Sequence, residues 1–271
     1  MNPMKKLLLL LTSALAALAL PGCFQNETTI HLNKDGSGTL VEETRLGAQM
    51  VAMMDQMAGL GGENANADPL AQMFSEDKAK ARAASLGEGV AYEKTELLTA
   101  GGAQGARVTY HFADINQLKV SAGDGVKNMS PMGDKAAEKA AKNAPIAFTY
   151  ADGKLTIRMP EPEKPDATEN PDMTDMERPE AQAMMKQMMG DMKLSMKVII
   201  EPGIAESNAT HQDGNTITLM EMNMGKLVEN PDNLKKLSSI DKNDPAAAME
   251  ALKGIDGVKF EAQREVTITL K

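Results

Sequence analysis

The sequence predicts an α+β protein: an antiparallel sheet built from β-hairpins, with helices packed against it, in a single domain with Met-rich and acidic insertions. Three observations predict this class. Short segments of alternating polarity recur along the chain, turns containing Asp-Gly or Gly-Gly join several of them, and segments of helical periodicity lie between the groups of strands.

The N-terminus has the features of a secretory signal. Lys5 and Lys6 precede an apolar run over residues 7–20, which is shorter than an ordinary membrane-spanning helix. The run ends at Leu20-Pro21-Gly22-Cys23, which resembles the lipobox of bacterial lipoproteins and contains the only cysteine. The resemblance implies that residues 1–22 are a lipoprotein signal peptide and that fatty acids such as palmitate acylate Cys23. The alternative is an ordinary secretory signal followed by a free cysteine, which is a liability in an oxidising compartment.

Residues 23–271 would then form an envelope-facing domain, held at the membrane through the lipid on its N-terminus. Phe24 follows the cysteine, and in enteric-type bacteria a residue other than Asp at this place permits export. We therefore expect the outer membrane, on its periplasmic face or at the surface. Without the signal the chain has 27 basic and 38 acidic residues, a formal charge of −11. This charge argues against a nucleic-acid partner and against broad electrostatic attachment to anionic lipid head groups.

The first half of the domain predicts two hairpins with helices between them. The four strands alternate in polarity and flank Gly-containing turns, and they are expected at residues 28–32, 40–44, 90–98 and 107–113. Helical periodicity predicts helices over residues 48–60 and 75–86, the second with Ser75 as its N-cap. In the first helix, methionines at three- and four-residue spacing share one face: Met50, Met53, Met54 and Met57.

The second half predicts a third hairpin, over residues 146–150 and 154–159, around Asp152-Gly153. Residues 160–180 are rich in proline and acidic side chains and cannot bury enough apolar area to become ordered, so we expect a disordered loop there, within the domain. The further expected elements are a helix over 181–192, strands over 194–200 and 216–222, helices opened by Pro231 and Pro245, and a terminal hairpin over 258–262 and 266–270.

Several short motifs resemble a known family. They are Ile200-Glu201-Pro202-Gly203-Ile204, Ser207-Asn208-Ala209 and Gly214-Asn215-Thr216-Ile217-Thr218. Together with the lipobox and the Asp35-Gly36-Ser37-Gly38 turn, these motifs are similar to those of LppM-like bacterial lipoproteins. The chain departs from that family in its long Met-rich and acidic insertions. The resemblance implies an α+β domain that binds lipid-like molecules, with no catalytic residues to carry over.

The reactive side chains do not predict an enzyme. Ser75 and Ser239 each begin a Ser-x-x-Lys pattern, but the Ser-Asp-Asn and Lys-Thr-Gly elements that penicilloyl-serine enzymes also need do not occur. An EF-hand-like spacing begins at His31, but its alternating flanks predict a hairpin instead of two helices. We therefore expect neither catalysis nor a cofactor.

Methionine is the unusual feature of the composition, with 22 residues against three Tyr, five Phe and no Trp. Two groups are candidates for an apolar-ligand site: Met184, Met188 and Met192 on the predicted helix, and Met220, Met222 and Met224 on one face of the predicted strand. Thioethers are soft ligands for Cu(I), so a metal site is one alternative. Plain core packing, with methionine in place of leucine, is the other.

These features predict a non-enzymatic, lipid-anchored protein of the cell envelope that binds an apolar or lipid-like ligand or a protein partner. A periplasmic Met-rich Cu(I)-binding protein and a structural envelope component are the alternatives. Native mass spectrometry of the protein purified from its host distinguishes the three. A bound lipid indicates the first function, a bound metal the second, and neither is expected for a structural component.

Overall fold

The computed structural model describes residues 24–59, 69–122, 124, 144–161, 190, 192–230, 232–233, 236 and 254–271. Over these residues the chain forms two sheets accompanied by helices, so the predicted α+β class is confirmed. The lipobox, the acidic segment beyond residue 161, most of the helix expected over 181–192 and the helix opened by Pro245 lie outside the described residues.

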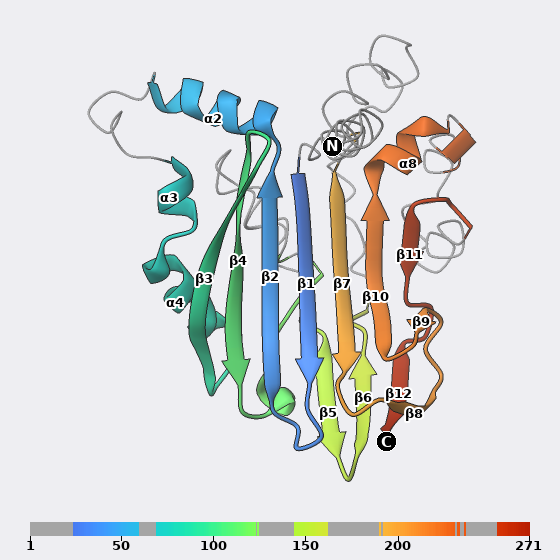
Figure 1. Cartoon of the computed structure of the whole chain (residues 1–271). Helices are drawn as coiled ribbons and strands as arrows, with labels where there is room; N and C mark the ends of the chain where they lie inside the picture. The colour runs from blue at the N-terminus through green and yellow to red at the C-terminus, as the bar shows by residue number, and fades with distance from the viewer. Residues whose placement is uncertain are drawn as a thin grey trace, which may run out of the picture.

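The larger sheet has eight strands. Seven follow the order β11-β10-β7-β1-β2-β4-β3, and β9 pairs with β10 (Figure 1). The strands are β1 (Phe24–Leu32), β2 (Gly38–Leu46), β3 (Val90–Ala100), β4 (Ala103–Phe112), β7 (Lys193–Ile200), β9 (Gln212–Asp213), β10 (Thr216–Asn223) and β11 (Val258–Phe260). The predicted β1–β2 and β3–β4 hairpins are confirmed. The second turn is tighter than expected, because only Gly101 and Gly102 separate the strands and both adopt positive φ.

One pair of neighbouring strands in this sheet is parallel. β1 and β7 run in the same direction, from Gln25 opposite Lys193 to Leu32 opposite Ile200. The prediction of a sheet built only from antiparallel hairpins is wrong at this pair. Parallel neighbours need a long connection instead of a turn, and no local sequence signal marks such a pairing. The other strand pairs among the described residues are antiparallel.

The smaller sheet has the order β5-β6-β12-β8 and lies against the lower half of the larger sheet as drawn in Figure 1. Its strands are β5 (Ala147–Ala151), β6 (Lys154–Arg158), β8 (Ile204–Ser207) and β12 (Glu265–Leu270). The β5–β6 hairpin is confirmed, with Asp152 and Gly153 at positive φ in its turn. The predicted terminal hairpin is wrong, because β11 pairs with β10 whereas β12 pairs with β6 and β8.

A buried carboxylate fixes the chain where it passes from β11 to β12. Glu261 is 3% exposed. The backbone N–H of Thr210 donates to its two carboxylate oxygens at 2.9 and 3.2 Å, and the hydroxyl of Thr210 donates to Oε1 at 2.6 Å. The backbone N–H of Gln263 donates to the same carboxylate at 2.8 Å. These charge-assisted bonds hold a crossover between sheets in place of the expected turn.

The helices lie beside and above the larger sheet in Figure 1. They are α2 (Ala48–Gly59), α3 (Pro69–Met73), α4 (Glu76–Ser85) and α8 (Met224–Glu229), with a 3-10 turn, η3 (Ile115–Gln117), after β4. The helices predicted over 48–60 and 75–86 are confirmed as α2 and α4. Ser75 is the N-cap residue of α4, as predicted, and its carbonyl accepts from the N–H of Ala79 at 3.0 Å, but its side chain makes no capping hydrogen bond. Glu76 and Asp77 in the first turn of α4 favour its N-terminus through the helix dipole instead.

The main core lies between the two sheets. The inner face of the larger sheet, defined as the face that packs on the smaller sheet, contributes buried side chains from five strands: Ile30, Leu32, Leu40, Tyr110, Phe112, Val198, Ile200, Ile217 and Leu219. The smaller sheet contributes Phe148, Leu155, Ile157, Ile204, Val266, Ile268 and Leu270. Burying one such aliphatic or aromatic side chain stabilises a fold by about 1.5–3 kcal/mol, so this layer is the main source of stability.

Candidate functional site

A second apolar cluster occupies the upper end of the inner face. Its fully buried members are Phe24, Leu46, Val51, Met54 and Leu194, and its half-buried members are Met50, Met73, Phe74, Met192, Met220 and Met222. We call these eleven residues the methionine cluster. They come from β1, β2, α2, α3, β7, β10 and the short segments beside them, so the cluster is assembled from distant parts of the chain.

A β-bulge in β10 places two methionines in this cluster. Thr218 lies opposite Lys197, whereas Met220 lies opposite Met196, so Leu219 is an extra residue in the strand. Without the bulge, strict alternation would place Met220 on the same face as Thr218, which is the outer face of the sheet. The shift turns Met220 and Met222 toward the inner face. Leu219, the extra residue of the bulge, is itself buried.

The sequence-predicted methionines have different outcomes. Met192, Met220 and Met222 are brought together in the cluster. Met224 does not share the strand face, because β10 ends at Asn223 and Met224 is the first residue of α8, where its N–H donates to the carbonyl of Met192 at 2.9 Å. Met184 and Met188 lie outside the described residues.

The methionines predicted to share one face of α2 lie on two different sides of the helix. Met54 is 7% exposed and packs in the cluster with the half-buried Met50, whereas Met53 is 40% exposed on the other side of the helix. The sequence did not predict that Met50 and Met54 would join Met220 and Met222. Their common location depends on β2 leading directly into α2 at the end where β10 also finishes.

On β1 and β2, a polar layer lies between the methionine cluster and the main core. Below Phe24 on the inner face of β1 come Asn26 and Thr28, which lie opposite Thr44 and Glu42 of β2. All four side chains are buried, and the Asn26 amide donates to the Thr44 hydroxyl at 2.9 Å. Polar groups need such partners once they leave water. The layer therefore divides the two apolar regions on β1 and β2, whereas on β10 Met220 packs against both of them.

Arg82 of α4 completes this layer between two buried carboxylates. Its Nη2 lies 2.7 Å from Oε1 of Glu42 and 3.0 Å from Oδ2 of Asp124. Burial alone would raise the pKa of Asp124, but the Arg82 charge and the N–H and hydroxyl of Ser121 lower it below its usual value. Burial alone would lower the pKa of Arg82, but Glu42 and Asp124 raise it. Neither pKa is close to 7, so the pair suits a structural role better than proton transfer.

A row of polar side chains crosses the outer face of the larger sheet, the face opposite the smaller sheet. Residues from seven strands lie in register along this row: Glu96, Arg107, Glu43, Glu27, Ser195, Glu221 and Lys259. Most of them line a groove of about 550 Å³, together with Thr29, His31 and Lys197. This surface was not predicted from the sequence, although the alternation of Glu27, Thr29 and His31 with Thr28 and the apolar Ile30 and Leu32 is the signal for it.

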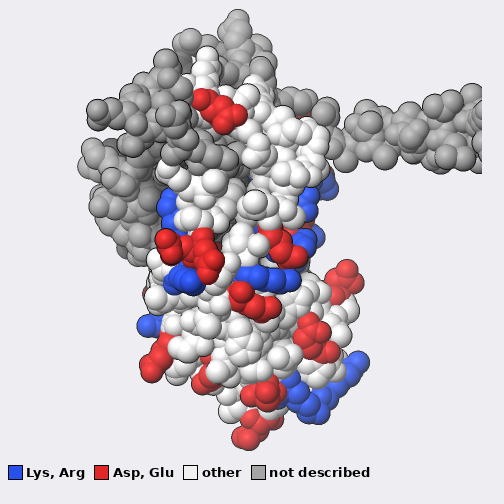
Figure 2. Space-filling view, turned by 60° about the vertical axis from the view of Figure 1, so that its left-hand side comes forward, with Lys and Arg blue, Asp and Glu red and all other residues white. Residues whose placement is uncertain are grey.

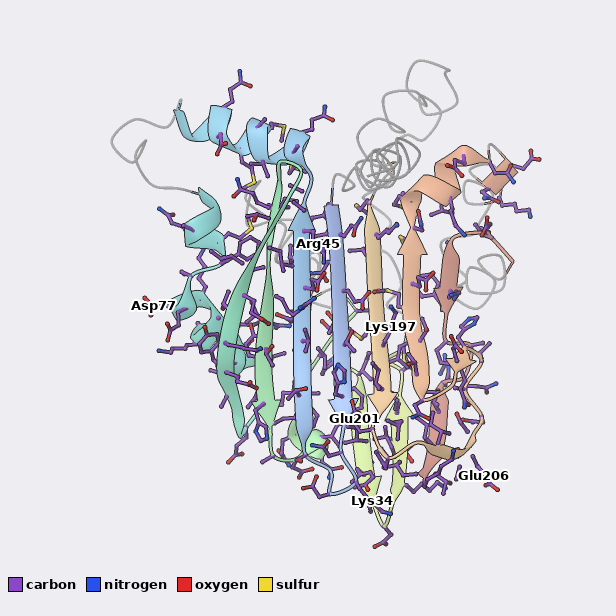
Figure 3. The ribbon with its side chains drawn as sticks, viewed as in Figure 1. Lys34, Arg45, Asp77, Lys197, Glu201 and Glu206 are labelled. Carbon is purple, nitrogen blue, oxygen red and sulfur yellow. The ribbon has the colours of Figure 1, made fainter. Side chains whose placement is uncertain are left out.

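The charges of this row are paired across the strands. Glu43 binds Arg107 at 2.7 Å and Arg45 at 2.6 Å, and Glu27 binds Lys197 at 3.1 Å. Burial would raise the pKa of Glu43, but hydrogen bonds from the two arginines lower it. Figure 3 shows Arg45 and Lys197 on this face, and Figure 2 shows basic and acidic side chains interspersed over the side of the molecule that carries α3 and α4. On the outer face, the ion pairs of Glu43 and Glu27 leave Arg107, Arg45 and Lys197 each beside a carboxylate and not as an unpaired cluster of positive charge.

The methionine cluster differs in its side-chain chemistry from a site built of His, Cys, Asp or Glu. Among the described residues, no group of three or more His, Cys, Asp or Glu side chains is placed to hold a metal ion. No helix within the described ranges is long and apolar enough to cross a membrane. The methionine cluster offers apolar contact and polarizable sulfur, which suits a flexible apolar chain.

The fold and these surfaces define a two-sheet α+β domain with a methionine-lined cluster at one end and a paired-charge sheet face. No protein-family model and no curated protein sequence matches the chain. Among solved structures, it is similar to the NMR structure of the folded domain of LppM from Mycobacterium tuberculosis, with 11% identity and a TM-score of 0.27 over 77% of this chain and 87% of that chain. A likeness of this size carries no argument about fold or function. The LppM-like resemblance stays a prediction from the sequence motifs.

Proposed function

We propose that this chain is a lipid-anchored, non-enzymatic protein of the cell envelope whose methionine cluster binds an apolar, lipid-like ligand. One observation carries the proposal. Phe24, the residue directly after the expected acyl acceptor Cys23, is 2% exposed and is itself a member of the methionine cluster. Consecutive Cα atoms are about 3.8 Å apart, so the anchor and the cluster occupy the same end of the domain. An apolar chain drawn from the bilayer would have a short path to the cluster.

The composition of the cluster supports a ligand of variable shape. Its half-buried members are five methionines and one phenylalanine: Met50, Met73, Met192, Met220, Met222 and Phe74. Unbranched thioether side chains adopt many rotamers and fit irregular apolar surfaces. The polar layer around Arg82 and Glu42 borders the lower end of the cluster on the β1 and β2 side, so on that side a ligand would stay at the membrane-proximal end.

Photocrosslinking tests the proposed site. The acylated protein would be reconstituted into phosphatidylethanolamine vesicles containing a diazirine phospholipid, and the crosslinked peptides identified by mass spectrometry. We expect crosslinks on peptides that contain Met192, Met220 and Met222. Met222→Glu should reduce the yield strongly, because a charge on the cluster disfavours an acyl chain. Thr218→Glu is the matched control, since it puts the same charge on the outer face of the same strand. Equal yields from the two variants would reject the site.

The copper alternative is tested with a variant that keeps the apolar volume. Changing Met192, Met220 and Met222 to Leu should leave phospholipid crosslinking largely intact, because leucine and methionine have similar volumes. The wild type and this variant would also compete for Cu(I) with a chelator. Tight Cu(I) uptake by the wild type that is lost in the variant would favour a Cu(I)-binding function over lipid binding. If an envelope protein co-purifies in stoichiometric amount and no lipid does, the ligand of this chain is a protein partner.

The proposed location is the outer membrane, on its periplasmic face or at the surface. It is supported by the lipobox and by Phe24 in the position that sorts enteric-type lipoproteins. Separation of host membranes by density, followed by immunodetection, tests it directly. Recovery in the inner-membrane fraction would contradict the outer-membrane assignment and leave the anchor itself intact.

A further inference from the structure

The solvent-facing side of α2 lacks the charges that exposed helix faces ordinarily carry. Met50, Val51 and Met54 belong to the methionine cluster, whereas Gln49, Ala52, Met53 and Gln56 are exposed at three- and four-residue spacing on the opposite side. Ala48 and Asp55 are also exposed, beside this row. Asp55 is the one charged residue in the helix, in a chain where a quarter of residues are charged. Ala52 and Met53 are apolar and the two glutamines are uncharged, so none of these four side chains carries a charge that contact with an apolar neighbour would have to desolvate.

The position of α2 identifies that neighbour. Leu46, the last residue of β2, lies opposite Phe24, the first described residue of β1, and α2 begins at Ala48. The helix therefore starts at the level where the chain enters from Cys23, and Figure 1 shows it extending across the top of the sheet. Among the described residues, the exposed large hydrophobic side chains are Met53, 40% exposed, and Leu97, 72% exposed. Leu97 lies three residues before the end of β3, in the upper half of the same sheet.

We propose that the outer face of α2, formed by Gln49, Ala52, Met53 and Gln56, lies on the lipid surface to which the domain is anchored. This inference rests on the lipid anchor of the proposed function. An anchor at Cys23 holds the helix close to the bilayer, so the contact is effectively intramolecular and a small uncharged face suffices. The face has almost no charge to desolvate. The formal charge of −11 would be repelled by anionic lipids, so the contact is apolar and does not depend on them.

Site-directed fluorescence tests the contact in the full acylated protein. Once Cys23 is acylated, an introduced cysteine is the only free thiol for labelling. Met53→Cys and Gln49→Cys would carry a nitrobenzoxadiazole label on the proposed face, and Glu206→Cys would carry it at the opposite end, where Figure 3 places Glu206. The protein would be reconstituted in phosphatidylcholine vesicles with or without lipids brominated on their acyl chains.

We expect brominated lipid to quench the labels at positions 49 and 53 several-fold more than the label at position 206, at low and high salt alike. Met53→Glu should release the label at position 49 from quenching, because it places a charge at the contact. Anchored protein with equally weak quenching at all three positions would overturn this inference and leave the anchor standing. Quenching that disappears in high salt would also overturn it. If the protein acquires no acyl chains, the lipid anchor of the proposed function is wrong. The contact of α2 with the lipid surface, which rests on that anchor, is then wrong as well.

Discussion

The guanidinium of Arg82 on α4 lies 2.7 Å from the carboxylate of Glu42 on β2, in the buried layer between the methionine cluster and the main core. The contact joins a helix to a strand 40 positions earlier in the chain. Asp124 binds the same guanidinium, so one cation holds three segments together.

Replacing Arg82 by Met should destabilise the domain strongly. It would leave Glu42 and Asp124 buried without their cation, and breaking a buried pair in this way costs about 3–5 kcal/mol. Urea unfolding followed by circular dichroism measures the loss. Arg107→Met is the control, since it removes a more exposed partner of Glu43 and should cost about 1 kcal/mol or less. Similar losses for the two variants would contradict the structural role of Arg82.

Acidification should weaken the fold through the same layer. The folded-state pKa of Asp124 is lowered, so the unfolded chain binds more protons at acidic pH. The stability from this group is present above the usual pKa of aspartate, about 3.9, and is lost as the pH falls through the lower folded value. Urea midpoints measured from pH 7 to pH 3 should therefore decline on the acid side. In Asp124→Asn that decline should be shallower, and an unchanged slope would show that other carboxylates, such as Glu43, account for it.

Gly38→Ala should be severe for a steric reason. A Cβ at this position would overlap the carbonyl oxygen of His31 and the ring of Phe112, at the point where β1, β2 and β4 meet. We expect a loss of about 2–4 kcal/mol in urea unfolding, as for an overpacked core position. Gly153→Ala is the comparison, because nothing lies within 4 Å of the added carbon and only the positive φ opposes it, at about 1 kcal/mol. Equal losses would show that packing around Gly38 relaxes easily.

Cys23→Ser should abolish acylation, since the thiol is the expected acceptor. Cells fed an alkyne fatty acid would label the wild-type chain and leave the variant unlabelled and uncleaved. A second alteration that keeps the cysteine, such as Gln25→Ala, serves as the control for expression. Equal labelling with and without Cys23 would remove the lipoprotein assignment.

Replacing residues 160–180 with a short Gly/Ser linker should change the melting temperature by only a few degrees. The replaced sequence has little apolar area to bury, and long surface insertions cost little in loop entropy. At its described start, the replacement removes the exposed ion pair between Glu161 and Arg264. Loss of cooperative thermal unfolding would mean that this segment packs on the domain.

Local signals predicted three hairpins and the helices α2 and α4, because turn residues and periodicity act over a few positions. Asp152-Gly153 and Gly101-Gly102 each mark a turn that the structure contains. The pairing of β1 with β7 and the separation of β11 from β12 were not predictable in this way, since they depend on contacts between distant segments. A propensity pattern has no information about which strand lies next to another.

The candidate site was partly predictable for the same reason. The sequence grouped Met220 with Met222, but the bulge at Leu219 decides which face they occupy, and a one-residue shift in a strand has no clear sequence signature. The contribution of Met50 and Met54 depends on how α2 meets β10 in space. Arg82, Glu42 and Asp124 look like ordinary surface charges in the sequence, and only their mutual pairing makes burial possible.

The parallel pairing of β1 with β7 also governs when the larger sheet can be completed during folding. Glu27 and Ser195, which contact each other across this pair, are 168 residues apart in the chain. Contacts of such separation form slowly, because a long loop must close before any pairing compensates for the lost entropy. The β1–β2 hairpin can form early, but β1 keeps one open edge until the residues of β7 arrive. During that interval the edge is available to another chain, so the waiting time for β7 sets the period in which this protein is most exposed to aggregation.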